Sequence, residues 1–386
     1  MTIVLDRGSD GPRVHAFLIG VGRYRHLAGG EDPVRHGLGN LRQLTSPPIS
    51  TVKIVEWLAT SLNHPTAQLG TIDVLLSPPQ DIDAGDGPIR VEKPDAQTVR
   101  RTFNGWKDRC DRSHENVAVF YFCGHGAQGP TSQHLFLEDF CANLNNKLEN
   151  TIDFDASWRG MGECKAKSQY FFIDACRVAN QELRGEFQSG GIILVRRSGY
   201  FVKESRVDHG YLMSAKEGAK SFGRENKISY FTEALLEALQ GWGARYLNNR
   251  WQVDLSEINR HVTWRVSTPP EDKRDRTRWQ ESPDLFMNGD PVLHLPDEPI
   301  LPVTIKCNPA FAASRAHLTV HEQNNPKPKK SRREVSGPWE IGLPPGSYYL
   351  RVTFPDGVRY KGADRELAIW MPPPPNSFEV EVEADP

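Results

Sequence analysis

The chain has 386 residues, of which 38% are hydrophobic and 25% are charged, so it is long enough for two or three domains with buried cores. Its 47 basic residues nearly balance its 49 acidic residues, which points to neither a nucleic-acid partner nor a membrane partner. Six cysteines without a CxxC pair or regular spacing argue against a zinc site and against a disulfide framework.

The first part of the chain alternates strands and helices. Apolar residues 14–21 and 71–76 predict two strands, and an apolar stripe over 49–62 predicts a helix between them with Ser46 as its N-cap. This order is typical of a parallel sheet. The run 16–21 is too short for a signal peptide, and no segment reaches the roughly 20 apolar residues that span a bilayer. We therefore expect a cytoplasmic protein without a membrane partner.

The loop after the second strand partly matches a calcium-binding loop. Asp81, Asp83 and Glu92 occupy positions 1, 3 and 12 of the helix-loop-helix calcium motif. Asp86 stands at position 6, where the motif requires glycine, and Gly85 offers no side-chain ligand at position 5. A solvated turn is favoured over a calcium site, and the sequence indicates no other metal or cofactor.

Two buried strands end on residues that can do chemistry. Residues 117–123 (VAVFYFC) lead into His125, and residues 169–174 (QYFFID) lead into Cys176. Continuous apolar runs suit the central strands of a parallel sheet, and ligands bind at the carboxyl ends of such strands. If the two strands are neighbours, His125 and Cys176 emerge together as a candidate base and nucleophile.

A cysteine attacks an amide as its thiolate, and a neighbouring imidazole can take the thiol proton. The amides of Gly126 and Cys176 could donate to the developing oxyanion, a contribution of about 3 kcal/mol per donor. A helix predicted to begin at Arg177 would also favour the thiolate. The residues alone leave a structural alternative open, because a cysteine at a strand end is usually a small core residue.

The two strand ends resemble those of the caspase-like cysteine peptidases, the group that includes caspases, metacaspases and prokaryotic relatives. The caspase signature has a histidine about 50 residues before the cysteine, and His125 precedes Cys176 by 51 residues. The resemblance extends over about residues 12–296. It implies a peptidase domain at 1–296 with a mostly parallel α/β sheet flanked by helices, in which His125 is the base and Cys176 the nucleophile.

The resemblance also suggests a specificity. Caspases have glutamine two residues before the cysteine and cleave after aspartate, whereas this chain has Asp174. In metacaspase-like members an acid at this position helps to line a pocket for arginine or lysine, which predicts cleavage after basic residues. A role for Asp174 as the cap of a helix beginning near Cys176 is equally compatible. The residues after Arg177 differ from the metacaspase pattern, so the chain matches neither branch fully.

Further positions follow from the same comparison. Ser214 and Ala215 are predicted to lie beside the nucleophile, where family members pair an extended substrate by β-addition. Arg196 and Arg197 lie in an irregular stretch after the cysteine and are candidate self-cleavage sites, with a solvated turn as the alternative.

The last 90 residues have a different composition. Short β-type runs separated by Pro, Gly and Asn predict a small β-sandwich at 297–386. The predicted strands are 302–307, 317–322, 339–343, 348–354, 367–371 and 378–383. The basic tract 327–333 is expected to be a mobile hairpin loop and not a nucleic-acid patch, because no aromatic residues are interleaved with it.

The expected function is that of a regulated protease acting on a protein substrate. Family members are held inactive until a ligand, partner or cleavage orders their loops, so the β-sandwich is predicted to be a sensor or docking surface for a small-molecule or protein activator. Prokaryotic relatives suggest antiphage defence or regulated cell death. Two alternatives stay open: a catalytically silent caspase-like scaffold whose sandwich binds a partner, and a flavodoxin-like hydrolase or nucleotide-binding domain. The second lacks a phosphate-cradling glycine loop.

Overall fold

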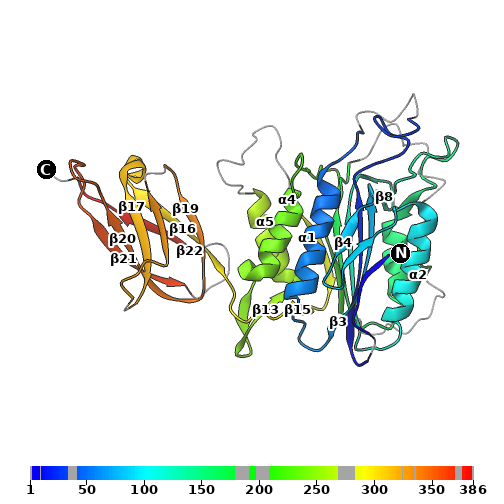
Figure 1. The fold of residues 1–386 in the computed structure, drawn as a ribbon, viewed down its shortest axis with the longest axis horizontal. Helices are drawn as coiled ribbons and strands as arrows, with labels where there is room; N and C mark the ends of the chain where they lie inside the picture. The colour runs from blue at the N-terminus through cyan, green and yellow to red at the C-terminus, as the bar shows by residue number, and fades with distance from the viewer. Residues whose placement is uncertain are drawn as a thin grey trace. The chain divides into compact units, whose positions relative to one another are not determined.

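The computed structural model describes residues 2–8, 10–33, 41–178, 191–196, 208–267, 283–323, 325–333, 336–369 and 376–384. The chain forms two compact units (Figure 1). The first comprises residues 1–236 and 254–295, and the second comprises 237–253 and 296–386. The segment 237–253, which the sequence analysis places in the peptidase domain, is thus grouped with the second unit. Trp251 of this segment packs against the second unit's core.

A seven-stranded sheet forms the centre of the first unit. Its strands are, in spatial order, β1 (Ile3–Asp6), β3 (Gln68–Ser77), β2 (Arg13–Val21), β6 (Val117–Cys123), β10 (Ser168–Asp174), β11 (Asp208–Met213) and β14 (Asp284–Asn288). The five inner strands are parallel, and the edge strands β1 and β14 are antiparallel to their neighbours. The predicted parallel α/β sheet is therefore confirmed.

Helices cover both faces of this sheet. They are α1 (Ser46–Ser61), α2 (Ala96–Cys110), α3 (Phe154–Met161), α4 (Tyr230–Glu237) and α5 (Leu255–Ser267). Figure 1 shows α2 on one face and α1, α4 and α5 on the other. On the α2 face, Trp106 packs against Phe17 and Phe120 with ring centroids 6.1 and 6.3 Å apart. Among the described residues, no helix combines the length and the hydrophobicity needed to cross a bilayer.

The N-cap of α1 differs from the prediction. Thr45 is the N-cap, and Ser46 is the first helical residue. The Thr45 hydroxyl makes no cap bond, because it accepts a hydrogen bond from the Asn226 amide at 2.8 Å. Pro47 lies in the first turn, where its missing N–H costs nothing.

Small sheets flank the central one. They are the hairpin of β4 (Asp81–Asp83) and β5 (Pro88–Arg90), and a three-stranded sheet of β7 (Gly126–Gln128), β8 (Gln133–Phe136) and β9 (Thr151–Asp153). The calcium-loop candidate thus lies on a hairpin. Asp81 faces Arg90 at 3.5 Å, Asp83 accepts turn amides, and Glu92 pairs with an arginine of α2. Within the described ranges, no group of three or more His, Cys, Asp or Glu side chains is arranged to hold a metal ion.

The second unit is β-rich. Its main strands are β16 (Leu301–Asn308), β17 (His317–Glu322), β18 (Lys330–Arg333), β19 (Trp339–Leu343), β20 (Gly346–Thr353), β21 (Ala363–Ile369) and β22 (Asn376–Glu381). They form the sheets β19-β16-β22 and β18-β17-β20-β21, whose apolar side chains share one core. Its other elements are the π-helix Ala238–Trp242, β12 (Arg245–Leu247), β13 (Arg250–Asp254) and the 3₁₀ helix Ala310–Arg315, whereas β15 (Val292–His294) belongs to the first unit. The predicted all-β character of this region is confirmed.

The basic tract at 327–333 was predicted to be a loop, but part of it forms a strand. Lys330–Arg333 form the edge strand β18, which pairs antiparallel with β17. Lysine and arginine side chains are common on edge strands because their charge discourages pairing with another chain.

Candidate active site

The two chemically capable strand ends lie side by side. Strands β6 and β10 are parallel neighbours, and their last registered pair is Cys123 with Asp174. His125 and Cys176 each follow two residues after that pair, so both leave the sheet at the same carboxyl edge. Both line one cavity of about 90 Å³, which Asp174 and Ser221 also line. The predicted proximity of the two strand ends is thereby confirmed.

Local hydrogen bonds determine which nitrogen of His125 carries the proton. Nε2 lies 2.7 Å from the carbonyl oxygen of Arg42, and a carbonyl can only accept. The neutral ring therefore carries its hydrogen on Nε2 and leaves Nδ1 as the basic nitrogen. Burial lowers the pKa of His125 below its usual 6.5, and the Arg42 carbonyl opposes that shift. At pH 7 the ring is neutral and ready to accept a proton.

Tyr24 and Gln43 hold the histidine and its acceptor in place. The His125 amide donates to the Tyr24 hydroxyl at 2.6 Å, and the two rings lie 4.9 Å apart. The Gln43 side chain accepts from the Tyr24 amide at 2.7 Å and donates to the carbonyls of Tyr24 and Ala28 at 3.0 and 3.1 Å. These bonds fix the chain beside Arg42. The sequence analysis did not find this support, because every residue type has a backbone carbonyl that can accept a hydrogen bond.

Cys176 is protonated at neutral pH. Burial raises the pKa of its thiol above the usual 9.0, and the nearby Asp174 carboxyl adds to the increase. The thiol donates to the Ser221 carbonyl at 3.3 Å. Cys176 is the partly exposed cysteine, and the other five are buried. The thiol and the His125 ring are therefore both neutral in the resting structure, and no thiolate–imidazolium pair is preformed.

This resting state predicts how Cys176 responds to pH. We expect its rate of alkylation by iodoacetamide to rise by about tenfold per pH unit from pH 6 to 8.5, because only the thiolate reacts and its pKa is raised. Mass spectrometry of the Cys176 peptide would measure the rate. His125→Ala is the control and should show the same slope. A rate that is already at its plateau near pH 6 would instead indicate a preformed thiolate–imidazolium pair.

The amide of Gly126 is directed away from β8. Gly126 and Leu135 are opposite each other in the antiparallel pair, and the Phe136 amide donates to the His125 carbonyl at 3.0 Å. Gly126 thus occupies a non-hydrogen-bonded position of the ladder, where an amide points away from the partner strand. A Cβ on Gly126 would lie 3.0 Å from Ala175 Cβ, a close contact beside the nucleophile. The Gly126 amide, which is the predicted oxyanion donor, is therefore not used in the hydrogen bonds between β7 and β8.

Hydrogen bonds fix the peptide groups on both sides of Cys176. The Ser214 hydroxyl donates to the Ala175 carbonyl at 3.3 Å, and Gln133 Nε2 donates to the Cys176 carbonyl at 2.8 Å. In a trans peptide the N–H points opposite to the C=O, so the first bond directs the Cys176 amide away from Ser214. A fixed amide direction is what an oxyanion donor requires.

Ser214 and Ala215 are fully buried. The Ser214 amide donates to the Ile173 carbonyl at 2.8 Å, so the chain continues alongside β10 beyond the end of β11. Strand β14 pairs with β11 as far as Met213 and ends there. The predicted pairing of substrate with Ser214 and Ala215 stays a prediction that concerns their backbone groups.

Asp174 does not cap a helix. Its carboxylate is buried and accepts hydrogen bonds from Ser221 at 2.9 Å, from Thr232 at 3.1 Å and from the Ser229 hydroxyl. Burial raises the pKa of Asp174, and these hydroxyl bonds oppose that change. The ring of hydroxyl groups comes from residues 47 to 58 positions further along the chain, so the local sequence gave no signal for it.

Arg177 and Val178, which directly follow Cys176, are not helical, contrary to the prediction. The Arg177 amide donates to the Ala219 carbonyl at 3.0 Å, and the Gly218 amide donates to the Arg177 carbonyl at 2.9 Å. These long-range bonds replace the local bonds of a helix. The Arg177 guanidinium also pairs with Asp284 of β14. Within residues 175–178, which the structure describes, no helix begins that would favour the thiolate.

The candidate self-cleavage region is described in part. Arg196 is exposed. Arg197 lies outside the described residues, as do most residues between 180 and 208. Self-cleavage at either arginine stays a prediction.

The chain is similar to several known proteins. The uncharacterised protein y4kE of Sinorhizobium fredii is 25% identical over 211 residues, which is 53% of this chain and 59% of that protein. The chain thus spans about three fifths of that relative's length. Among solved structures, caspase-1 of Spodoptera frugiperda matches with a TM-score of 0.43 and 13% identity, covering 75% of this chain and 95% of that one. The protein GSU0716 of Geobacter sulfurreducens has the same score and identity, with coverages of 72% and 95%.

The family assignment rests on a sequence profile. The caspase-domain profile matches residues 80–287, more than half of the 386 residues. The matched range includes both strand ends and the cavity residues Asp174 and Ser221. The chain therefore belongs to the caspase domain family, whose members are cysteine peptidases.

Proposed function

We propose that this protein is a cysteine endopeptidase that uses His125 as its base and Cys176 as its nucleophile. The observation that carries the proposal is the shared cavity, which brings a thiol and a neutral imidazole together at the edge of the sheet. The alternative of a silent scaffold does not account for a histidine whose acceptor carbonyl leaves Nδ1 free.

The proposed reaction has two stages. Cys176 Sγ attacks the scissile carbonyl carbon while its proton passes to His125 Nδ1, and the oxyanion accepts from the Gly126 and Cys176 amides. Collapse of the intermediate breaks the C–N bond, and the imidazolium gives its proton to the leaving amine. Water then hydrolyses the thioester, with His125 taking the water proton and returning it to the thiolate.

Asp174 is proposed to select arginine or lysine before the cleaved bond. Its Oδ2 accepts from Ser229, Thr232 and the Cys123 thiol, whereas Oδ1 accepts from Ser221. A carboxylate oxygen can accept more than one hydrogen bond, so Oδ1 retains capacity for a substrate cation. A buried carboxylate attracts such a cation strongly and repels an aspartate side chain.

Regulation is proposed because the resting thiol is bonded to the Ser221 carbonyl and not to the base. An activator bound by the β-rich region at 297–386, either a small molecule or a protein, would shift the loop that carries Ser221. By extension from prokaryotic family members, the protease would act in the cytoplasm in antiphage defence or cell death.

Hydrolysis of fluorogenic peptides ending in arginine, lysine or aspartate tests the proposal. We expect release after arginine and lysine by the wild-type protein and none by Cys176→Ala, with or without calcium. Release after aspartate alone would keep the dyad and reject Asp174 as the selector. Equal release by both proteins would refute the peptidase assignment.

A further inference from the structure

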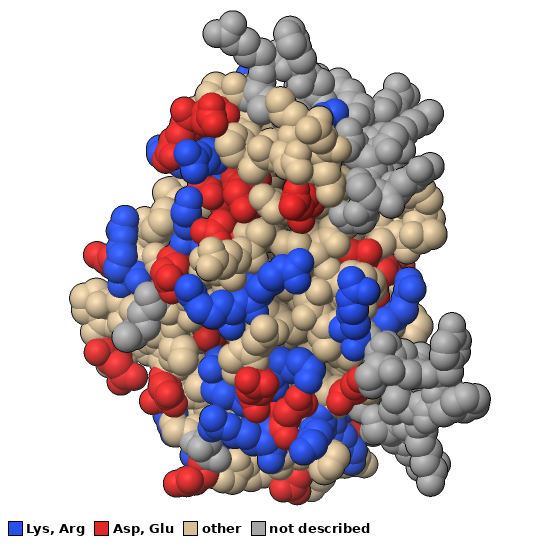
Figure 2. All heavy atoms as spheres, turned by 90° about the vertical axis from the view of Figure 1, so that its right-hand side faces the viewer, with Lys and Arg blue, Asp and Glu red and all other residues tan. Residues whose placement is uncertain are grey.

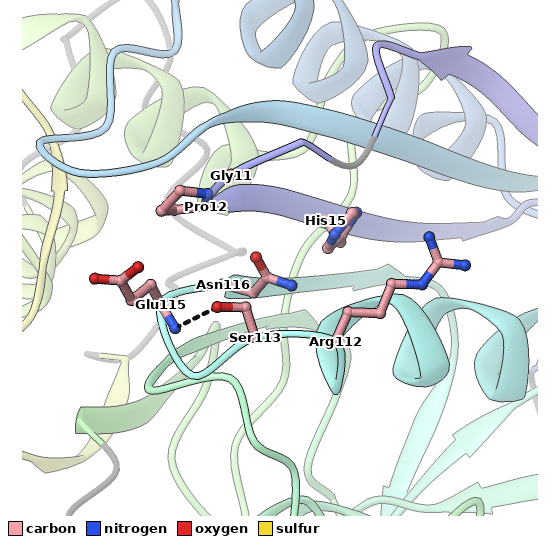
Figure 3. Close-up of a pocket in the computed structure, with 7 residues that line it drawn as sticks. All are labelled: Gly11, Pro12, His15, Arg112, Ser113, Glu115 and Asn116. Carbon is pink, nitrogen blue, oxygen red and sulfur yellow. Dashed lines mark hydrogen bonds between the residues drawn. The ribbon is translucent and has the colours of Figure 1, made fainter.

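A second cavity lies at the opposite edge of the central sheet. Its volume is about 260 Å³ (Figure 3). It is lined by Gly11 and Pro12 before β2, by His15 of β2, and by four residues before β6, which are Arg112, Ser113, Glu115 and Asn116. These segments meet at the amino ends of the two strands, whereas His125 and Cys176 follow the carboxyl ends of β6 and β10. The cavity is therefore separate from the candidate active site.

His15 presents an N–H group to this cavity. Its Nδ1 lies 3.0 Å from the Thr71 hydroxyl, which accepts from Arg109 Nε at 3.1 Å. Arg109 can only donate, so the buried hydroxyl proton of Thr71 needs His15 Nδ1 as its acceptor. Burial and nearby arginines lower the pKa of His15 to about 4, so the ring is neutral at pH 7. Its single proton is therefore on Nε2.

The His15 ring lines the cavity, and its Nε2–H has no acceptor in the described part of the chain. His15 is 1% exposed, and the hydrogen bonds of its ring involve Nδ1. Such a donor gains a hydrogen bond when a ligand or a water molecule supplies an acceptor. The ring lines the cavity, so an acceptor placed there would satisfy it.

The charges near His15 are mainly positive. The guanidinium groups of Arg109, Arg112 and Arg13 all lower its pKa, and Asp6 opposes them. Arg109 is neutralised by Asp73, whereas Arg112 is exposed and has no ion-pair partner among the described residues. Figure 2 shows lysine and arginine side chains gathered on the face that carries α2, with acidic side chains among them.

The other polar groups of the cavity are compatible with an anion. The Ser113 hydroxyl accepts from the Glu115 amide at 3.2 Å, which leaves its own proton free to donate. Asn116 already bonds the Arg13 amide and the Arg109 carbonyl. Figure 3 shows the Glu115 carboxylate at the opposite end of the cavity from Arg112.

We propose that this cavity binds a phosphate group, either inorganic phosphate or a phosphomonoester. Arg112 and the Ser113 hydroxyl supply donors from the segment before β6, and His15 Nε2–H supplies one from β2. A phosphomonoester offers three acceptor oxygens to these donors, whereas a carboxylate offers two. The site is independent of the proposed protease function.

Calorimetric titration of the full chain at constant ionic strength tests the site. Inorganic phosphate and ribose 5-phosphate should bind saturably and acetate should not, and tighter binding of the sugar phosphate would identify a phosphomonoester as the ligand. Arg112→Ala should weaken phosphate binding about tenfold or more, because it removes a charge-assisted donor. Arg101→Ala is the matched control, since Arg101 is an exposed α2 residue paired with Glu92, and it should bind as the wild type does.

A second measurement addresses the donor on His15. Nitrogen-15 NMR of the imidazole should show the Nε2–H form, with Nε2 shifting when phosphate is added. Thr71→Val should remove the preference of His15 for the Nε2–H form and weaken phosphate binding. Finding the Nδ1–H form, or equal phosphate binding by wild type, Arg112→Ala and Thr71→Val, would overturn the proposal. Absence of saturable binding to the wild type at millimolar phosphate would do the same. Neither measurement uses peptide hydrolysis. A failure of the phosphate-site proposal can therefore be distinguished from a failure of the peptidase proposal.

Discussion

Replacing Cys176 with alanine is expected to reduce kcat for an arginine-ended peptide by at least about 10⁴-fold, because the variant cannot form the thioester. His125→Ala should reduce kcat by about 10²- to 10⁴-fold, which is the usual contribution of a general base. A fluorogenic assay at pH 7.5 would measure both effects. The thiol is neutral in the resting structure, so every turnover needs a base that takes its proton.

The controls separate chemistry from folding. Cys307→Ala removes a buried cysteine of the second unit, and His114→Ala removes an exposed histidine of the first unit. Both should retain the wild-type kcat. The double variant of His125 and Cys176 should be no slower than Cys176→Ala, since residues acting in one step are not additive. Strictly additive losses would indicate that the two side chains do not act together.

Replacing Asp174 with asparagine is expected to reduce kcat/KM for arginine- and lysine-ended peptides by at least about 30-fold. Loss of one partner of a buried charge pair costs about 2–5 kcal/mol, and the carboxylate is the buried charge that faces the cavity. The alkylation rate of Cys176 should not fall, because the thiol and His125 are retained and Asp174 is one of the groups that raise the pKa of the thiol. The comparison of peptide hydrolysis with alkylation therefore isolates substrate recognition.

Asp139→Asn is the matched control for this prediction. Burial raises the pKa of Asp139 to about 6, so it resembles Asp174 in its environment, but it accepts from the Ala96 amide and lies outside the cavity. Asp139→Asn should leave the preference for basic peptides unchanged. An Asp174→Asn variant with undiminished arginine cleavage would leave the hydroxyl-bonded carboxylate with a structural role only.

The sequence predicted the parts of the site that depend on strand order. Residues 117–123 and 169–174 are continuously apolar because both faces of their strands are covered, and such runs are recognisable without a structure. Their adjacency followed from the parallel sheet, and it placed His125 and Cys176 at one edge. The edge strands β1 and β14 were missed because they are short and partly exposed, so their apolar pattern is weak.

The surroundings of the dyad could not be predicted in the same way. A capping role was one of the two interpretations of Asp174, based on its position near a supposed helix, but its partners Ser221, Ser229 and Thr232 are distant in sequence. The backbone of residues 175–178 bonds to segments distant in sequence, such as Gln133 and Ala219. Interactions of this kind depend on tertiary packing, which local propensity does not encode.

The division of the chain into two units has a consequence at the level of the gene. The chain crosses between the units three times, after Leu236, Val253 and Leu295. A stop codon after position 295 would therefore not yield the first unit alone. It would leave segment 237–253 attached to that unit and deprive Trp251 of the core against which it packs. Segment 237–253 would bind a separately expressed 296–386 fragment. We therefore expect two polypeptides split after position 295 to reassemble.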